Sequence, residues 1–217
     1  MNLDLFSSVP AVRTEPESLG PGAVLLPGLA APHTSSLMSA IKWVAERAPF
    51  RNMTTRGGYR MSVAMTNCGA AGWVSDPSGY RYDAVDPDSG LCWPAMPSAL
   101  SNLAHDASAR AGFPGFAPDA CLINRYEPGA RLSLHQDKNE RDYAAPIVSV
   151  SLGLPAVFLF GGTRRAERAR RVPLAHGDIV VWGGPARLRY HGVQPLQDGE
   201  HAVLGRHRVN LTFRVAL

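Results

Sequence analysis

The chain has 217 residues, of which 45% are hydrophobic and 18% are charged, and its formal net charge is +4. These values are ordinary for a soluble globular protein and exclude a disordered chain or a fibrous repeat. The basic balance is compatible with a polyanionic partner, although many basic proteins bind no nucleic acid.

The N-terminus and the cysteines bear on the cellular compartment. Residues 1–6 contain Asp4 and lack a basic flank followed by a long apolar run, so we predict neither a secretory signal nor a membrane span. The cysteines Cys68, Cys92 and Cys121 lie far apart without CxxC spacing, which favours reduced thiols over disulfides or a zinc knuckle. We therefore expect a cytoplasmic protein, and nothing in the sequence requires an assembly larger than a monomer.

The chain shows no internal repeat and no long linker. Residues 1–22 are rich in Pro, Ser and Glu, and we expect them to form a loose lead-in. We therefore predict one domain over residues 23–217.

Two helices are predicted in the first half of the chain. Residues 35–47 carry apolar side chains at helical spacing, with Thr34 or Ser35 as the candidate N-terminal cap. Residues 98–111 repeat this spacing, and Gly112 is placed to end the helix.

A turn-rich stretch over residues 51–94 separates the two helices. Its Gly-Gly, Asp-Pro and Ser-Gly pairs are typical of hairpin turns. The stretch also concentrates aromatic and methionine side chains, namely Tyr59, Met61, Met65, Trp73, Tyr80 and Tyr82.

From residue 119 onward the pattern becomes one of short strands separated by turns. The candidate strands are residues 121–126, 132–137, 147–154, 156–160, 178–182, 191–195 and 208–215. Such a series indicates a sandwich or a double-sheet jelly roll. The predicted fold class is therefore mainly β with flanking helices, and its core covers about residues 119–217.

A candidate metal site lies within this β region. His135 and Asp137 are two residues apart, so on a strand both side chains project from the same face. His191 comes from a distant strand and could complete a triangle with them. Two histidines and one carboxylate are the ligand set of a facial-triad iron(II) site. Polar residues at strand ends and an ordinary surface histidine explain the same pattern.

The last strand carries a polar face of Arg208, Asn210, Thr212 and Arg214. If this face points inward, its two arginines need an anion, because buried charge is otherwise costly. A guanidinium matches carboxylate geometry, so a small dicarboxylate would suit. An edge strand with a solvated polar face is the alternative.

Asn124 and Tyr126 also share a strand face. Their amide and hydroxyl could supply neutral hydrogen bonds to a bound keto acid. They could equally be polar residues on an exposed face.

A basic segment follows Gly161-Gly162. Arginine suits phosphate contacts, so the segment could bind a nucleic-acid backbone, and a solvated loop is an equally good explanation. Its members are Arg164, Arg165, Arg168, Arg170 and Arg171.

Several short strings together match the pattern of one family. They lie at residues 124–126, 134–138, 147–154, 180–184 and 210–214. These strings resemble AlkB-type alkylated-DNA repair dioxygenases, and the likeness is strongest to the bacterial founding member. Residues 57–59 and 61–67 resemble the nucleotide-recognition lid of that family. The likeness covers roughly residues 22–215.

The resemblance implies a double-stranded β-helix core with an N-terminal lid within about residues 51–94. It implies a catalytic iron(II) held by His135, Asp137 and His191. It also implies that 2-oxoglutarate is held by Asn124, Tyr126, Arg208, Asn210 and Arg214.

The same resemblance implies an O2-dependent reaction on alkylated nucleic acid. A methyl group on a base nitrogen is oxidised and leaves as formaldehyde, while 2-oxoglutarate becomes succinate. The expected substrates are bases of the 1-methyladenine and 3-methylcytosine type in single- or double-stranded DNA, with RNA as a further candidate.

A base inside a duplex cannot reach a buried iron, so it must be flipped out or presented on a single strand. Trp73 is the stacking partner that the resemblance implies, with His135 on the opposite face of the base. A core aromatic that anchors a loop is the alternative for Trp73. Further lid or strand-contact positions are Thr55, Tyr59, Met61, Tyr80, Tyr82 and Arg165. A phosphate contact suits Arg165, whereas the tyrosines and the methionine could serve packing.

One residue departs from the family pattern. The family has an aspartate that contacts the exocyclic amine of the damaged base, and this chain has Asn139 at that position. Asn139 can accept a hydrogen bond but brings no negative charge. We therefore expect a weaker preference for cationic over neutral lesions.

Two other functions fit part of the pattern. A nucleic-acid-binding module without catalysis would lack iron-dependent succinate formation. A jelly-roll oxygenase acting on protein or a metabolite would lack salt-sensitive binding to oligonucleotides.

Overall fold

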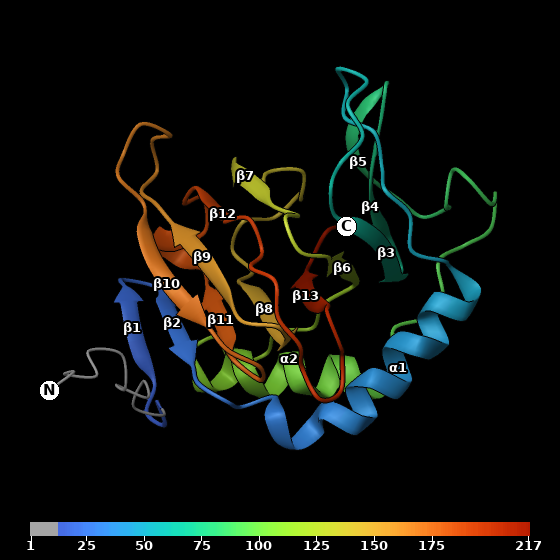
Figure 1. The fold of residues 1–217 in the computed structure, drawn as a ribbon. Helices are drawn as coiled ribbons and strands as arrows, with labels where there is room; N and C mark the ends of the chain where they lie inside the picture. The colour runs from blue at the N-terminus through green and yellow to red at the C-terminus, as the bar shows by residue number, and fades with distance from the viewer. Residues whose placement is uncertain (1–12) are drawn as a thin grey trace, which may run out of the picture.

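The computed structural model describes residues 13–217, and two antiparallel sheets dominate it (Figure 1). The larger sheet contains, in spatial order, β1 (Glu17–Gly20), β2 (Ala23–Leu26), β11 (Ile179–Trp182), β8 (Ile147–Gly153), β13 (Arg208–Arg214), β6 (Ala120–Tyr126) and β3 (Ala64–Gly69). The smaller sheet contains β10 (Arg170–Leu174), β9 (Ala156–Phe160), β12 (His191–Val193) and β7 (Leu132–His135). This double sheet confirms the predicted jelly-roll class.

The two faces of the larger sheet are covered by different layers. Alternate residues such as Val209, Leu211 and Phe213 of β13 pack into one apolar cluster with the helices. The opposite face contributes Leu122 and Trp182 to a second cluster, which also contains side chains of the smaller sheet. The period-two alternation of a strand therefore decides which side chains meet the helices and which lie between the sheets.

The predicted helices are α1 (Thr34–Arg47) and α2 (Ser98–Arg110). Two short 3-10 turns, η1 (Ala31–His33) and η2 (Gly184–Ala186), complete the helical elements in residues 13–217. The predicted cap of α1 is wrong: His33 occupies the cap position, and the Thr34 hydroxyl donates to the Ala31 carbonyl oxygen at 2.8 Å. In the part of the chain that the structure describes, no helix is long and apolar enough to cross a membrane.

The turn-rich stretch contains the predicted hairpin, formed by β4 (Gly72–Asp76) and β5 (Gly79–Asp83). It stands at the end of the molecule away from the helices (Figure 1). The side chain of Asn67 in β3 fixes its base, because the Asn67 amide donates to the Trp73 carbonyl oxygen and accepts from the Trp73 N–H, both at 3.0 Å.

Several strand boundaries differ from the sequence predictions. Residues 1–12 of the expected lead-in lie outside the described residues, but Glu17–Gly20 forms β1 and pairs with β2. Four strands were not predicted at all, namely β1, β2, β3 and β10, and Arg170 and Arg171 belong to β10 rather than to a loop. The strand predicted over 132–137 ends at His135.

Candidate active site

A polar strip runs through the face of the larger sheet that looks toward the smaller sheet. Strand register creates it, because Arg208 lies opposite Tyr126 and Asn210 lies opposite Asn124. On the other side of β13, Asn210 pairs with Ser151. The shared face predicted for β13 is confirmed, and the solvated edge-strand alternative is excluded because β13 lies between β8 and β6.

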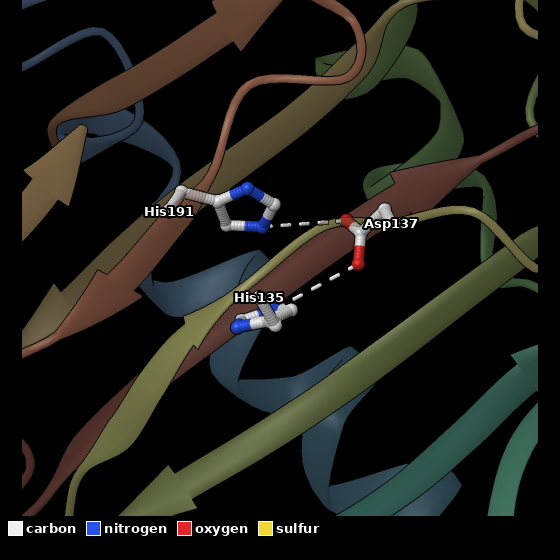
Figure 2. Close-up of side chains that lie close together, drawn as sticks. All are labelled: His135, Asp137 and His191. Carbon is white, nitrogen blue, oxygen red and sulfur yellow. Dashed lines mark ion pairs between the residues drawn. The ribbon is translucent and has the colours of Figure 1, made fainter. Parts of the chain in front are cut away.

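The three predicted metal ligands come together at one end of this strip (Figure 2). One ligand atom from each of His135, Asp137 and His191 lies within 4.8 Å of the others. His135 Nε2 is 3.8 Å from Asp137 Oδ1, and His191 Nε2 is 3.5 Å from Asp137 Oδ2. His135 and His191 are direct partners in the β7–β12 register, which sets their rings 4.4 Å apart between centroids.

Backbone contacts leave the same nitrogen of each histidine facing Asp137. His135 Nδ1 lies 2.9 Å from the Ser133 carbonyl oxygen, and His191 Nδ1 lies 3.0 Å from the Arg189 carbonyl oxygen. A carbonyl can only accept, so each Nδ1 carries a proton, and Nε2 is the ring nitrogen left for a metal. This arrangement of the outer contacts is the one that orients metal-binding histidines.

The pKa shifts of His135 and Asp137 favour the protonation states that a metal requires of its ligands. Burial and the neighbouring His191 lower the pKa of His135 to about 4, so its ring is neutral at pH 7. Burial alone would raise the pKa of Asp137, but the charges of Arg214 and His191 hold it well below its usual range. Two imidazoles and one carboxylate are the ligand set that suits a divalent cation such as iron(II).

Asp137 reaches the triad by a route that differs from the predicted shared strand face. It lies in the loop after β7, where Arg187 Nη1 donates to its carbonyl oxygen at 2.8 Å. Arg214 holds its side chain, with Nε and Nη2 donating to Oδ2 at 3.0 and 2.7 Å.

Arg208 shows that the polar strip suits an anion. Its side chain is buried, and only Nη2 is paired, with the Ser151 hydroxyl at 3.0 Å. In residues 13–217, its Nε and Nη1 have no hydrogen-bond partner and it takes part in no ion pair. Asn124 Oδ1 and the Tyr126 hydroxyl are also buried without a partner among the described residues. A buried cation beside unsatisfied polar groups fits one carboxylate of 2-oxoglutarate, and the two donors of Arg214 provide a second cationic group on the same strand face.

Asn210 holds the strip together. Its amide donates to the Ser149 hydroxyl at 2.8 Å and to the Val150 carbonyl oxygen at 2.9 Å. Its oxygen accepts from the Thr212 hydroxyl at 3.0 Å and from the Asn124 amide at 3.4 Å. These contacts use most of the hydrogen-bonding capacity of the Asn210 side chain and orient its neighbours in the strip.

The lid hairpin brings the predicted base-contacting residues together. Trp73 and Tyr80 stack with ring centroids 5.7 Å apart and an interplanar angle of 11°. Asn139 lies beside them, because its Oδ1 is 3.4 Å from Trp73 Nε1 and its Nδ2 is 3.4 Å from the Tyr80 carbonyl oxygen. Trp73 is half-buried, which differs from the fully buried core aromatic of the alternative interpretation.

The other predicted contact residues lie in different surroundings. Thr55 and Tyr59 close a tight turn through a 2.9 Å backbone hydrogen bond, and Tyr59 is 77% exposed. Met61 is half-buried against the apolar cluster between the sheets, as the packing alternative expects. Arg165 is exposed, with its guanidinium 6.0 Å from the Tyr190 ring centroid.

Sequence reasoning missed two charged residues behind the triad, Glu140 and Arg187. Both are buried, and Arg187 Nη2 lies 3.2 Å from Glu140 Oε2. Glu140 follows the metal motif closely, but the spacing gave no signal for its partner. Arg187 follows η2 in a segment without a recognisable motif, so no pattern could have found it.

Comparison with known proteins places these features in a family. The family profile described as "2OG-Fe(II) oxygenase superfamily" matches residues 22–214. The chain is 56% identical to "Alpha-ketoglutarate-dependent dioxygenase AlkB" of Salmonella typhimurium over 214 residues, which cover 99% of this chain and 98% of that protein.

Two more distant relatives extend the comparison. The chain is 34% identical to the mouse "Nucleic acid dioxygenase ALKBH1" over 131 residues, which cover 59% of this chain and 33% of that protein. The structure described as "The structure of OsALKBH1" superposes with a TM-score of 0.80 at 28% identity, covering 93% of this chain and all of that one. The match over nearly the whole chain, the triad and the buried anion site agree with cofactors Fe(II), 2-oxoglutarate and O2, and the chain belongs to the AlkB-type alpha-ketoglutarate-dependent dioxygenases of the 2OG-Fe(II) oxygenase superfamily.

Proposed function

We propose that this protein repairs nucleic acid by oxidative demethylation of bases alkylated on a ring nitrogen, of the 1-methyladenine and 3-methylcytosine type. The observation that carries this proposal is the His135–Asp137–His191 cluster, joined through Arg214 to a polar strip in which Arg208 has no carboxylate partner among residues 13–217. The names of its relatives, an AlkB dioxygenase and a nucleic acid dioxygenase, support the substrate class.

The proposed division of roles follows the geometry. His135, Asp137 and His191 would hold iron(II), with Nδ1 of each histidine anchored to the backbone. The keto acid would be held by Asn124, Tyr126, Arg208, Asn210 and Arg214. Burial raises the pKa of Tyr126, so its hydroxyl stays protonated and can donate to a carboxylate.

The bound iron, keto acid and O2 together supply an oxidant for a C–H bond, while 2-oxoglutarate becomes succinate and CO2. The base therefore has to present its methyl group at the open side of the triad, which requires an unstacked nucleotide. The product of methyl oxidation, an N-hydroxymethyl base, loses formaldehyde and returns an N–H. The protein's contribution is positioning, because a misplaced methyl group would leave the oxidant without its target.

The lid residues would position the base and its strand. Trp73 and Tyr80 offer an aromatic surface of stacked rings, and Asn139 lies against it. Thr55, Tyr59, Met61 and Tyr82 would add contacts from the same region, and Arg165 would contact a phosphate. Stacking accepts every base, so discrimination would rest on Asn139 and the shape of the site.

We further propose that a single domain over residues 23–217 acts on single- or double-stranded DNA, and on RNA as a second polymer, as a cytoplasmic monomer. The proposed site residues lie on both sheets and on the lid hairpin. Because neither sheet alone holds all of them, this spread supports a single domain. The three free cysteines agree with a reducing compartment.

The test is anaerobic reconstitution with iron(II) and 2-oxoglutarate, followed by O2 and a single-stranded oligonucleotide carrying one 3-methylcytosine. Mass spectrometry would follow the loss of one methyl group. His135→Ala removes a ligand, whereas His33→Ala changes an exposed histidine outside the site and serves as the matched control. Demethylation that vanishes only in His135→Ala is the expected result. Succinate formation without demethylation would keep the oxygenase and overturn the substrate.

A further inference from the structure

A cluster of buried polar groups lies behind the triad, and two of its members, Glu140 and Arg187, have no part in the roles assigned above. At its centre, the Glu140 side chain is only 1% exposed. The Tyr82 hydroxyl donates to Glu140 Oε1 at 2.8 Å, and Arg214 Nε lies 3.3 Å from the same oxygen. Arg187 Nη2 lies 3.2 Å from the second oxygen, Oε2. One carboxylate therefore meets a phenol and two guanidinium groups.

The partners of Glu140 come from parts of the chain with different tasks. Tyr82 belongs to β5 of the lid hairpin, and Arg214 belongs to β13 at the end of the polar strip. Arg187 fixes the loop between them, because its Nη1 donates to the Asp137 carbonyl oxygen at 2.8 Å and its Nε donates to the Ala145 carbonyl oxygen at 3.1 Å. Glu140 thus connects Tyr82 of the lid to Arg214, which holds the carboxylate of Asp137.

Arg214 is shared between two carboxylates. Its Nε is 3.0 Å from Asp137 Oδ2 and 3.3 Å from Glu140 Oε1. A cation bound by Asp137 would partly neutralise its carboxylate and so weaken its attraction for Arg214. Glu140 would then carry a larger share of the attraction, and the oxygen that accepts from Tyr82 is the oxygen that faces Arg214. Filling the cofactor site therefore changes the surroundings of the lid hydrogen bond.

We propose that Glu140 is a positioning residue that couples occupancy of the iron and 2-oxoglutarate site to ordering of the lid strand β5 through the Tyr82 hydroxyl. This inference rests on the cofactor chemistry of the proposed function and adds a connection from the cofactors to the nucleic-acid lid. Coupling between two sites is reciprocal, so ordering of β5 must strengthen cofactor binding by the factor by which the cofactors order β5.

The test is backbone hydrogen exchange of β5, measured anaerobically with and without iron(II) and 2-oxoglutarate. In the native protein, loading should slow exchange of the β5 amides by roughly five- to 150-fold, the usual range of such coupling. Tyr82→Phe deletes one hydroxyl and should remove this slowing. The same variant should weaken 2-oxoglutarate binding, measured by titration into the iron(II) protein, by the same factor.

Two further variants separate the hydrogen bond from the charge. Glu140→Gln keeps an oxygen that can accept from Tyr82 but loses the charge that attracts Arg214. It should keep the β5 protection of the unloaded protein and lose the response to loading. Tyr143→Phe is the matched control, because it deletes a tyrosine hydroxyl that donates to the Lys138 carbonyl oxygen in the same loop without touching Glu140. It should behave like the native protein.

Two results would overturn the coupling. The first is a native protein whose β5 amides exchange at the same rate with and without cofactors. The second is a Tyr82→Phe variant that exchanges faster by the same factor in both states and binds 2-oxoglutarate normally, since a purely structural hydrogen bond behaves in this way. If Glu140→Gln fails to fold, Tyr82→Phe still decides. None of these readouts needs a methylated base, so a wrong substrate would leave them unchanged.

Discussion

Arg214 donates two hydrogen bonds to a single oxygen of Asp137, from Nε at 3.0 Å and from Nη2 at 2.7 Å. Arg208, six residues earlier on the same face of β13, has no such anion among residues 13–217. The two arginines are both buried, so their difference lies in the partner and not in exposure. Before any cofactor binds, one guanidinium is neutralised and the other is not.

This difference predicts opposite effects on stability. Arg208→Met removes a buried charge without an anion, so the cofactor-free protein should be at least as stable as the native protein. The native protein should gain about 2.7 kcal/mol at a 2-oxoglutarate concentration of 100 times Kd, and the variant should gain almost nothing. Urea unfolding of the iron(II) proteins, with and without 2-oxoglutarate, measures both quantities.

Arg214→Met provides the contrasting result. It leaves Asp137 and Glu140 buried without their shared cation, and breaking a buried pair in this way costs about 3–5 kcal/mol. The cofactor-free variant should therefore unfold at a clearly lower urea concentration. Equal destabilisation by the two substitutions would contradict the proposal that Arg208 binds a carboxylate of 2-oxoglutarate.

A second prediction concerns the exposed arginines between β9 and β10. Each phosphate contact contributes about 0.7 to the slope of log affinity against log salt for single-stranded nucleic acid. If Arg165 makes one such contact, Arg165→Gln should reduce the slope by about 0.7. Fluorescence anisotropy with a labelled oligonucleotide over a range of salt concentrations measures it.

Arg164→Gln is the matched control for that measurement. Arg164 is also exposed but already contacts Glu167, with Nε 3.0 Å from Oε1. Its neutralisation should change the slope less than that of Arg165. Equal slopes in all three proteins would show that this loop does not contact phosphate.

The sequence predicted best where residue chemistry and strand period act together. The β13 face of Arg208, Asn210 and Arg214 follows from period two alone, and the structure confirms it. The triad was found by ligand type, although Asp137 lies on a loop. The types of the three residues therefore predict the metal site, whereas the shared strand face predicted for His135 and Asp137 is not what brings them together.

The missed features depend on tertiary contacts. Strand β10 contains Pro173, which argues against a strand, but β10 lies at the sheet edge, where proline needs no partner. Thr34 was expected to cap α1, but its hydroxyl lies 2.8 Å from His176 Nε2, a contact across 142 residues. The Glu140–Arg187 pair likewise joins two loops, and no sequence pattern near either residue indicates that these loops lie close together.

His176 predicts a pH dependence of stability. Its Nδ1 accepts from the Gly153 N–H at 3.0 Å, so a proton there would break the contact. Burial first, and then the charge of His201, lower the pKa of His176 below 6.5, while Asp178 opposes them. A lowered pKa means that the neutral form is favoured by folding. This stability is therefore fully present above pH 6.5 and is lost as the pH falls through the folded pKa.

His176→Asn tests this dependence, because an asparagine oxygen can accept from Gly153 without titrating. Urea unfolding between pH 8 and pH 5 should show a weaker loss of stability in the variant than in the native protein. Parallel curves for the two proteins would assign the acid sensitivity to other groups.

The departure at Asn139 predicts altered lesion preference. Asn139 Oδ1 lies 3.4 Å from Trp73 Nε1, at the edge of the stacked aromatic surface proposed to receive the base. Asn139→Asp adds a negative charge there and should favour the cationic 3-methylcytosine over the neutral 3-methylthymine by about 1 kcal/mol, or roughly fivefold in kcat/KM. Competition between the two lesions in oligonucleotides of the same sequence measures the ratio directly. Because both substrates share strand, salt and enzyme, an unchanged ratio would mean that the side chain at position 139 does not sense the charge of the base.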